Sequence, residues 1–253
     1  MKFSANLGFL WNDRPLPKAI YEAKAAGFHA VECHFPYDVH PADVRTALNE
    51  TGLQMLGINT IRGNSANGEF GLAALPGREE AALKSIDLAI RYAIEIGARN
   101  VHVLAGIASG AQALGVYKAN LYYAAEKAAK HRINILIEPL NPRSNPGYLL
   151  NSADMAASII QELKLPNLKI MFDCYHEQII RGDLLNRATR LLPLIGHIQF
   201  AGVPDRFGPD TGEVDYGWLL PKLVAAGYQG YFGAEYRVNG AVEDSLGWMS
   251  KFK

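Results

Sequence analysis

Short apolar runs alternate with longer amphipathic stretches along the whole sequence, and this alternation restricts the fold more than any other feature. A short apolar run followed by a helical period is typical of a strand–helix unit in a parallel sheet. Eight runs have this character, at residues 2–8, 30–35, 54–60, 100–106, 133–140, 168–176, 196–202 and 230–236. Eight such units in 253 residues predict an α/β protein, a (β/α)8 TIM barrel forming a single domain over residues 1–253.

The stretches between the runs carry apolar residues at helical spacing. Gly27 and Gly97 stand where two of these helices are expected to end, because glycine adopts the left-handed conformation of a helix C-terminus. The expected helices cover residues 15–26, 41–50, 76–96, 111–130, 152–163, 183–192 and 215–225, and another begins near residue 241. A doubly wound open sheet is the alternative, but no GxGxxG turn follows the first expected strand.

The composition of the chain argues against several classes of protein. Its 25 basic and 25 acidic residues balance and no lysine or arginine run occurs, so nucleic acid is not expected as a partner. No apolar run approaches the length of a membrane span, and the first residues, MKFSANLGFLW, lack the pattern of a signal peptide. We therefore expect a cytoplasmic protein with a small-molecule substrate, and a homo-oligomer is left open.

Polar residues stand at the ends of four consecutive expected strands. They are Glu138, Asp173, Gln199 and Glu235. In a TIM barrel the carboxyl ends of the strands hold the active site, and neighbouring strands bring their ends together. Three carboxylates that converge would repel one another strongly unless a cation lay between them. Carboxylate and amide oxygens suit a hard divalent ion, so these four residues predict a site for Mg²⁺ or Mn²⁺.

Each of these residues, taken alone, has a simpler explanation. A single glutamate at a strand end is usually a salt-bridge partner or a solvated residue, and a single glutamine is usually a hydrogen-bonded strand residue. The coincidence of four oxygen donors on consecutive strands favours the metal site. Zinc would instead require His176 or Cys174 to join the set.

Several segments of the sequence resemble the hydroxypyruvate isomerase family, which belongs to the xylose isomerase-like TIM barrels. The segments are IEPLN, FDCYH, HIQFAG, DTGEVDY and GAEY, with KFSANLGFLW, FPYD, PGREE and RYAIEIGA towards the N-terminus. The resemblance implies that Glu138, Asp173, Gln199 and Glu235 are the metal ligands and that Glu138 and Glu235 are the catalytic acid and base. It implies interconversion of hydroxypyruvate and 2-hydroxy-3-oxopropanoate through an enediolate.

Two further residues are expected to bind the substrate. His176 lies about one helical turn beyond Asp173 and can hydrogen-bond a substrate oxygen. Arg206 follows the seventh expected strand, and a guanidinium matches the geometry of a substrate carboxylate. The glycine-rich segment RGNSANGEFG, residues 62–71, is either a lid over the site or an ordinary surface loop.

One position departs from the pattern of the resembling family. Ile58 stands where related hydroxypyruvate isomerases carry a histidine, so oxo-tetronates remain alternative substrates to hydroxypyruvate. A ketose 3-epimerase or an inosose dehydratase of the same fold is also open, although Gln199 occupies the place of a histidine in the epimerases. A non-catalytic sugar-binding barrel is the alternative from another class, and it would not need two glutamates flanking an ion.

Overall fold

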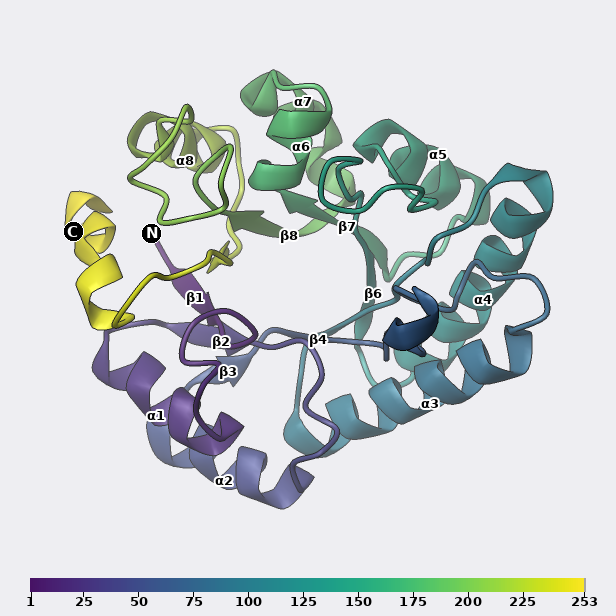
Figure 1. Ribbon diagram of the computed structural model, residues 1–253, viewed down its shortest axis with the longest axis horizontal. Helices are drawn as coiled ribbons and strands as arrows, with labels where there is room; N and C mark the ends of the chain where they lie inside the picture. The colour runs from purple at the N-terminus through teal and green to yellow at the C-terminus, as the bar shows by residue number, and fades with distance from the viewer. Residues whose placement is uncertain (253) are drawn as a thin grey trace.

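The computed structural model describes residues 1–252 and confirms the predicted TIM barrel, with helices surrounding a central ring of strands (Figure 1). Nine parallel strands form the sheet, in the order β3-β2-β1-β9-β8-β7-β6-β5-β4. Their bounds are β1 Phe3–Asn6, β2 Ala30–Glu32, β3 Gln54–Met55, β4 Gly57–Asn59, β5 Asn100–His102, β6 Asn134–Ile137, β7 Leu168–Asp173, β8 Ile195–Phe200 and β9 Phe232–Ala234.

The third position of the barrel is divided into two short strands. β3 pairs with β2 and β4 pairs with β5, with Leu56 between them. The amide of Cys33 donates to the carbonyl of Gly57 over 3.1 Å, so the backbone around β2 also reaches β4 and the ring closes there. The expected strand over residues 54–60 is therefore one barrel position that is interrupted once.

The helices lie outside the strands, as the alternating sequence predicts (Figure 1). Their bounds are α1 Leu16–Ala25, α2 Pro41–Thr51, α3 Glu79–Ile96, α4 Gly110–Ala129, α5 Ala153–Leu163, α6 Cys174–Ile180, α7 Leu184–Leu191 and α8 Tyr216–Ala225. Gly97 follows α3 with φ 72°, the left-handed conformation that its place in the sequence predicted. None of the helices within residues 1–252 is both long and apolar enough to cross a membrane.

The structure corrects the sequence prediction at two elements. The expected strand over residues 168–176 ends at Asp173, because the Asp173 side chain accepts a hydrogen bond of 2.8 Å from the amide of Tyr175 and begins α6. The helix expected from near residue 241 is divided into two 3-10 helices, η3 Glu243–Ser245 and η4 Gly247–Phe252, and is not one continuous helix.

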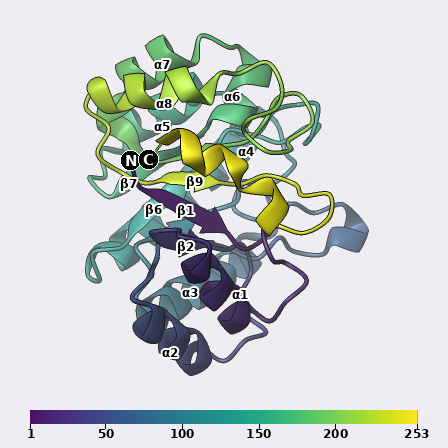
Figure 2. The ribbon, with the colours of Figure 1, turned by 90° about the vertical axis from the view of Figure 1, so that its left-hand side faces the viewer.

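These last turns cover the outside of the barrel beside β1. The ring of Trp248 is buried and packs on Phe3, with ring centroids 5.0 Å apart, and on Phe200 at 5.3 Å. The N-terminus and η4 consequently lie near one another in both ribbon views (Figures 1 and 2). Aromatic packing of Trp248 against β1 and β8 thus takes the place of an α-helix after β9.

Candidate active site at the carboxyl ends of the strands

The four predicted metal ligands are all buried at the carboxyl ends of their strands. Glu138 follows β6, Asp173 ends β7, Gln199 lies in β8 and Glu235 follows β9. Asp173 and Gln199 are register partners. Glu138, Gln199 and Glu235 line one cavity inside the barrel, of about 30 Å³. The strand ends therefore supply oxygen donors from four neighbouring barrel positions, as expected.

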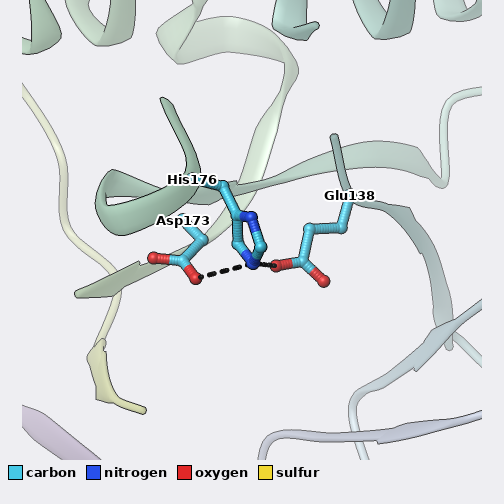
Figure 3. Close-up of side chains that lie close together, drawn as sticks. All are labelled: Glu138, Asp173 and His176. Atoms are coloured by element: carbon cyan, nitrogen blue, oxygen red, sulfur yellow. Dashed lines mark ion pairs between the residues drawn. The ribbon is translucent and has the colours of Figure 1, made fainter. Parts of the chain in front are cut away.

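Glu138, Asp173 and His176 form a compact buried cluster (Figure 3). Nε2 of His176 lies 3.7 Å from Oδ2 of Asp173 and 4.0 Å from Oε1 of Glu138. On the other side of the ring, Nδ1 accepts a hydrogen bond of 2.9 Å from the amide of Asn141. Because Nδ1 is an acceptor and burial keeps the pKa of His176 well below its usual value, the neutral ring carries its proton on Nε2. The Nε2–H group of His176 thus faces the two carboxylates, and the three side chains lie close enough together to hold a metal ion.

Arg206 lies between two of the acids. Its Nη2 donates to Oδ2 of Asp173 over 3.2 Å and to Oε1 of Glu235 over 2.9 Å. The guanidinium also packs against the rings of Phe9 and Tyr175, at 4.8 and 4.9 Å from their centroids. Arg206 therefore supplies positive charge where the strand ends place acids, and the structure brings both predicted substrate-binding residues, His176 and Arg206, to the site.

The surroundings push the pKa values of the carboxyl groups in different directions. Burial, with repulsion from Glu235 and Asp173, raises the pKa of Glu138 well above its usual value. Burial also raises the pKa of Asp173 to about 7, against the attraction of Arg206. Burial alone would raise the pKa of Glu235, but Arg206 and the hydrogen bond from His34 outweigh it and lower that pKa. Glu138 and Asp173 thus bind a proton more tightly than Glu235 does.

Sequence reasoning missed a buried network beneath these residues, centred on Glu32 of β2. Oε1 of Glu32 accepts hydrogen bonds from Nε2 of Gln199 over 2.9 Å and from Nδ2 of Asn6 over 3.3 Å. Nε2 of His197 lies 2.5 Å from the other oxygen of Glu32. Nδ2 of Asn6 also donates to Glu235, over 3.0 Å. The network therefore directs the amide nitrogen of Gln199 towards Glu32. The side-chain carbonyl oxygen of Gln199 is left available to bind a cation.

Two further histidines were also missed. Nε2 of His34, after β2, lies 3.3 Å from Oε1 of Glu235. Nδ1 of His102, in β5, lies 3.6 Å from Oε2 of Glu138, and burial lowers the pKa of His102 to about 3. The signal that could have found them is the same as for the four acids, namely polar residues in the apolar runs VECH and NVHV of the first half of the chain.

The donor set fits a divalent cation. Oε1 of Glu138 and Oε1 of Gln199 are buried, and within residues 1–252 neither has a hydrogen-bond partner. A buried oxygen without a partner is costly, and repelling carboxylates add to that cost. A cation held by Glu138, Asp173, Gln199 and Glu235 would satisfy both requirements. Oxygen ligands of this kind suit Mg²⁺ or Mn²⁺.

A second cavity, of about 70 Å³, leads to the same glutamates. Its wall includes Glu138, Glu235, His176 and Arg206. Three phenylalanine rings, Asn145 and Arg62 also line it. The two glutamates therefore border both cavities, as groups that meet a bound small molecule would.

Comparisons with known proteins agree with this architecture. The model of the xylose isomerase-like TIM-barrel family matches residues 20–252. The chain is 42% identical to 2-oxo-tetronate isomerase of Cupriavidus necator, over 99% of this chain and 98% of that protein. It is 35% identical to hydroxypyruvate isomerase of Escherichia coli, over the full length of both. A crystal structure of an AP endonuclease, family 2, from Brucella melitensis superposes with a TM-score of 0.95 at 35% identity, covering 100% of this chain and 99% of that one.

The barrel, its buried acids and these similarities lead to one assignment. Both relatives are matched over nearly their whole length, well above the similarity that fold alone produces. The resemblance seen in the sequence is thereby confirmed. The chain belongs to the xylose isomerase-like TIM-barrel family, in the group that contains hydroxypyruvate isomerase and 2-oxo-tetronate isomerase.

Proposed function

We propose that this protein is a metal-dependent isomerase of small hydroxy-oxo acids, acting on hydroxypyruvate or a closely related oxo-tetronate. The observation that carries the proposal is that two buried glutamates, Glu138 and Glu235, border the same cavities beside a set of oxygen donors. Isomerisation of a hydroxy-oxo compound moves a proton between adjacent carbons, and two carboxyl groups provide one acid and one base. The names of the relatives from C. necator and E. coli support this class of substrate.

The chain's own residues have distinct parts in this proposal. One of Glu138 and Glu235 removes the proton from the carbon that carries the hydroxyl, and the other delivers a proton to the neighbouring carbonyl carbon. His176, with its proton on Nε2, and Arg206 donate hydrogen bonds to substrate oxygens. A bound Mg²⁺ or Mn²⁺ supplies positive charge beside the oxygens that become negative during the transfer.

Other features of the protein favour a small-molecule substrate over a polymeric one. The chain has no net charge, and three acids lie at the site, so a polyanion such as DNA would be repelled there. The two cysteines, Cys33 and Cys174, are buried and unpaired, which is the state expected in a reducing compartment. These observations support a cytoplasmic enzyme of small metabolites.

A substrate panel tests the proposal. The purified protein is freed of metal with EDTA, reloaded with Mn²⁺ or Mg²⁺, and assayed with hydroxypyruvate, 2- and 3-oxo-tetronates, tagatose, fructose, inosose and DNA that contains abasic sites. We expect turnover of at least one hydroxy-oxo acid with metal and none in EDTA. Turnover of ketoses alone would make the protein a sugar isomerase or epimerase, and cleavage of the DNA would make it a nuclease.

A further inference from the structure

Arg62 presents a positive charge at the 70 Å³ cavity. Its guanidinium lies between the rings of Phe35 and Phe70, 4.8 Å from each centroid. Within residues 1–252, no carboxylate lies within the 4.0 Å that defines an ion pair with Arg62. Burial lowers the pKa of Arg62, so the protein partly desolvates this charge without providing an acid to offset the loss.

The backbone holds Arg62 in position. Its carbonyl accepts a hydrogen bond of 2.7 Å from the amide of Gly71, which joins the two ends of the loop 62–71. Gly71, at φ 110°, lies so close to the segment after β5 that an added Cβ would be 2.7 Å from the carbonyl oxygen of Leu104. A larger residue would not fit there. The two rings and the fixed loop base thus orient the guanidinium before any ligand arrives.

Arg62 and the two glutamates border one cavity. The 70 Å³ cavity is lined by Arg62 and by both Glu138 and Glu235. The second arginine on its wall, Arg206, already donates to Asp173 and Glu235. Arg62 is therefore the arginine of this cavity whose charge the protein's own acids leave uncompensated.

We infer that Arg62 binds the carboxylate of the substrate and thereby selects hydroxy-oxo acids over neutral ketoses. A guanidinium recognises a carboxylate through two parallel hydrogen bonds, and stacking between two rings keeps its plane fixed. An acid that enters a cavity bordered by carboxylates also needs a cation away from them, because otherwise the like charges would repel it. Arg206 then remains available for the oxygens near the reacting carbons.

This inference rests on the proposed function, so its test includes a readout that does not depend on turnover. D-glycerate is an unreactive hydroxy acid, and D-glyceramide is its uncharged counterpart of nearly the same shape. Binding of both to the Mn²⁺-loaded protein is measured by calorimetry, for wild type and for Arg62→Met, which keeps a long side chain between the rings but removes the charge. We expect the dissociation constant for D-glycerate to rise by about tenfold or more and that for D-glyceramide to stay unchanged.

Two further variants sharpen the experiment. Arg143→Met removes an exposed arginine from the segment after β6, outside both cavities, and should leave D-glycerate affinity unchanged. Arg62→Lys keeps the charge without the planar fork and should restore part of the affinity. If hydroxypyruvate is a substrate, Arg62→Met should also raise its KM by about tenfold or more while kcat changes little.

The inference is overturned if Arg62→Met binds D-glycerate as tightly as wild type, or if it loses D-glyceramide and Mn²⁺ affinity to the same extent. A protein that binds D-glycerate through Arg62 but isomerises no hydroxy-oxo acid would contradict the proposed function and leave the anion site in place. The two failures are therefore distinguishable.

Discussion

Glu138 and Glu235 are chemically identical side chains in different surroundings. Within residues 1–252, Oε1 of Glu138 has no hydrogen-bond partner, and burial with repulsion from Glu235 and Asp173 raises the pKa of this group. Glu235 is held by Arg206, His34 and Asn6. The sequence predicted both residues because each interrupts an apolar run at a strand end. It did not predict that Glu32, Asn6 and His102 meet these glutamates and Gln199, because contacts across the barrel interior depend on strand tilt and stagger, which no local pattern encodes.

At the residue scale, we expect Glu138→Gln and Glu235→Gln each to lower kcat by at least about 100-fold, because an amide neither accepts nor returns a proton in the working pH range. The far-ultraviolet circular dichroism spectrum should not change, since the amide occupies nearly the same volume. Glu213→Gln, at an exposed loop position, serves as the control and should keep full activity. A near-normal rate in either test variant would remove that residue from the mechanism.

At the scale of elements, side chains decide where strands stop. Apolar periodicity predicted α3, α4 and α5 to within a few residues. The strand ending at Asp173 was predicted three residues too long, because FDCYH is apolar enough for a strand and only the cap formed by the Asp173 side chain ends it. The helix expected from near residue 241 is two 3-10 helices instead, in a region where Trp248 packs against Phe3 and Phe200.

A pair of strand glycines tests the network around Glu32. A Cβ added at Gly233, in β9, would lie 2.5 Å from Oε1 of Glu32 and 2.8 Å from Nε2 of His197, whereas at Gly57, in β4, the nearest atom would be 3.8 Å away. We expect Gly233→Ala to lower the free energy of unfolding by about 2 kcal/mol and to weaken Mn²⁺ binding, because displacement of Glu32 releases the Gln199 amide. Gly57→Ala should change neither quantity appreciably. Chemical denaturation and calorimetry measure both, and equal effects at the two sites would contradict the role given to Glu32.

At the scale of the whole molecule, eight strand–helix units were enough to predict a closed barrel, because a parallel sheet of eight units with outer helices closes on itself. The same count could not predict the divided third position, since the break at Leu56 comes from hydrogen bonding with both neighbours. The closed ring gathers the buried acids, and their charge then influences the stability of the entire protein.

The pH dependence of stability follows from Asp173. The pKa of Asp173 in the folded protein, about 7, is above its ordinary value of 3.8, so the folded state holds the proton more tightly than the unfolded state. In EDTA, wild type should therefore lose stability relative to Asp173→Asn as the pH rises from about 4 to about 7, and the difference should then level off. Unfolding free energies of both proteins across this range give the measurement. If the difference in unfolding free energy between wild type and Asp173→Asn did not change with pH, the raised pKa of Asp173 would be contradicted.

Bound metal should stabilise the protein more as the pH rises, which is opposite to the effect of Asp173 in EDTA. The ligands bind a cation only after losing their protons, so Mn²⁺ should raise the melting temperature more at pH 8 than at pH 6. Asp173→Asn, which alters one of the proposed ligands, should show a smaller increase at both pH values. An increase that is equal at the two pH values in wild type would indicate that the ion binds elsewhere.

The hydrogen bond between Asn6 and Glu235 joins the first strand to the segment after the last one, 229 residues away along the chain. A nascent chain on the ribosome therefore lacks both the closed ring and this contact until β9 has emerged and docked. The buried acids of the earlier strands therefore lack some of their hydrogen-bond partners during synthesis. Assembly of the barrel and acquisition of activity are thus a single late event, and no shortened product of translation that ends before β9 would be active.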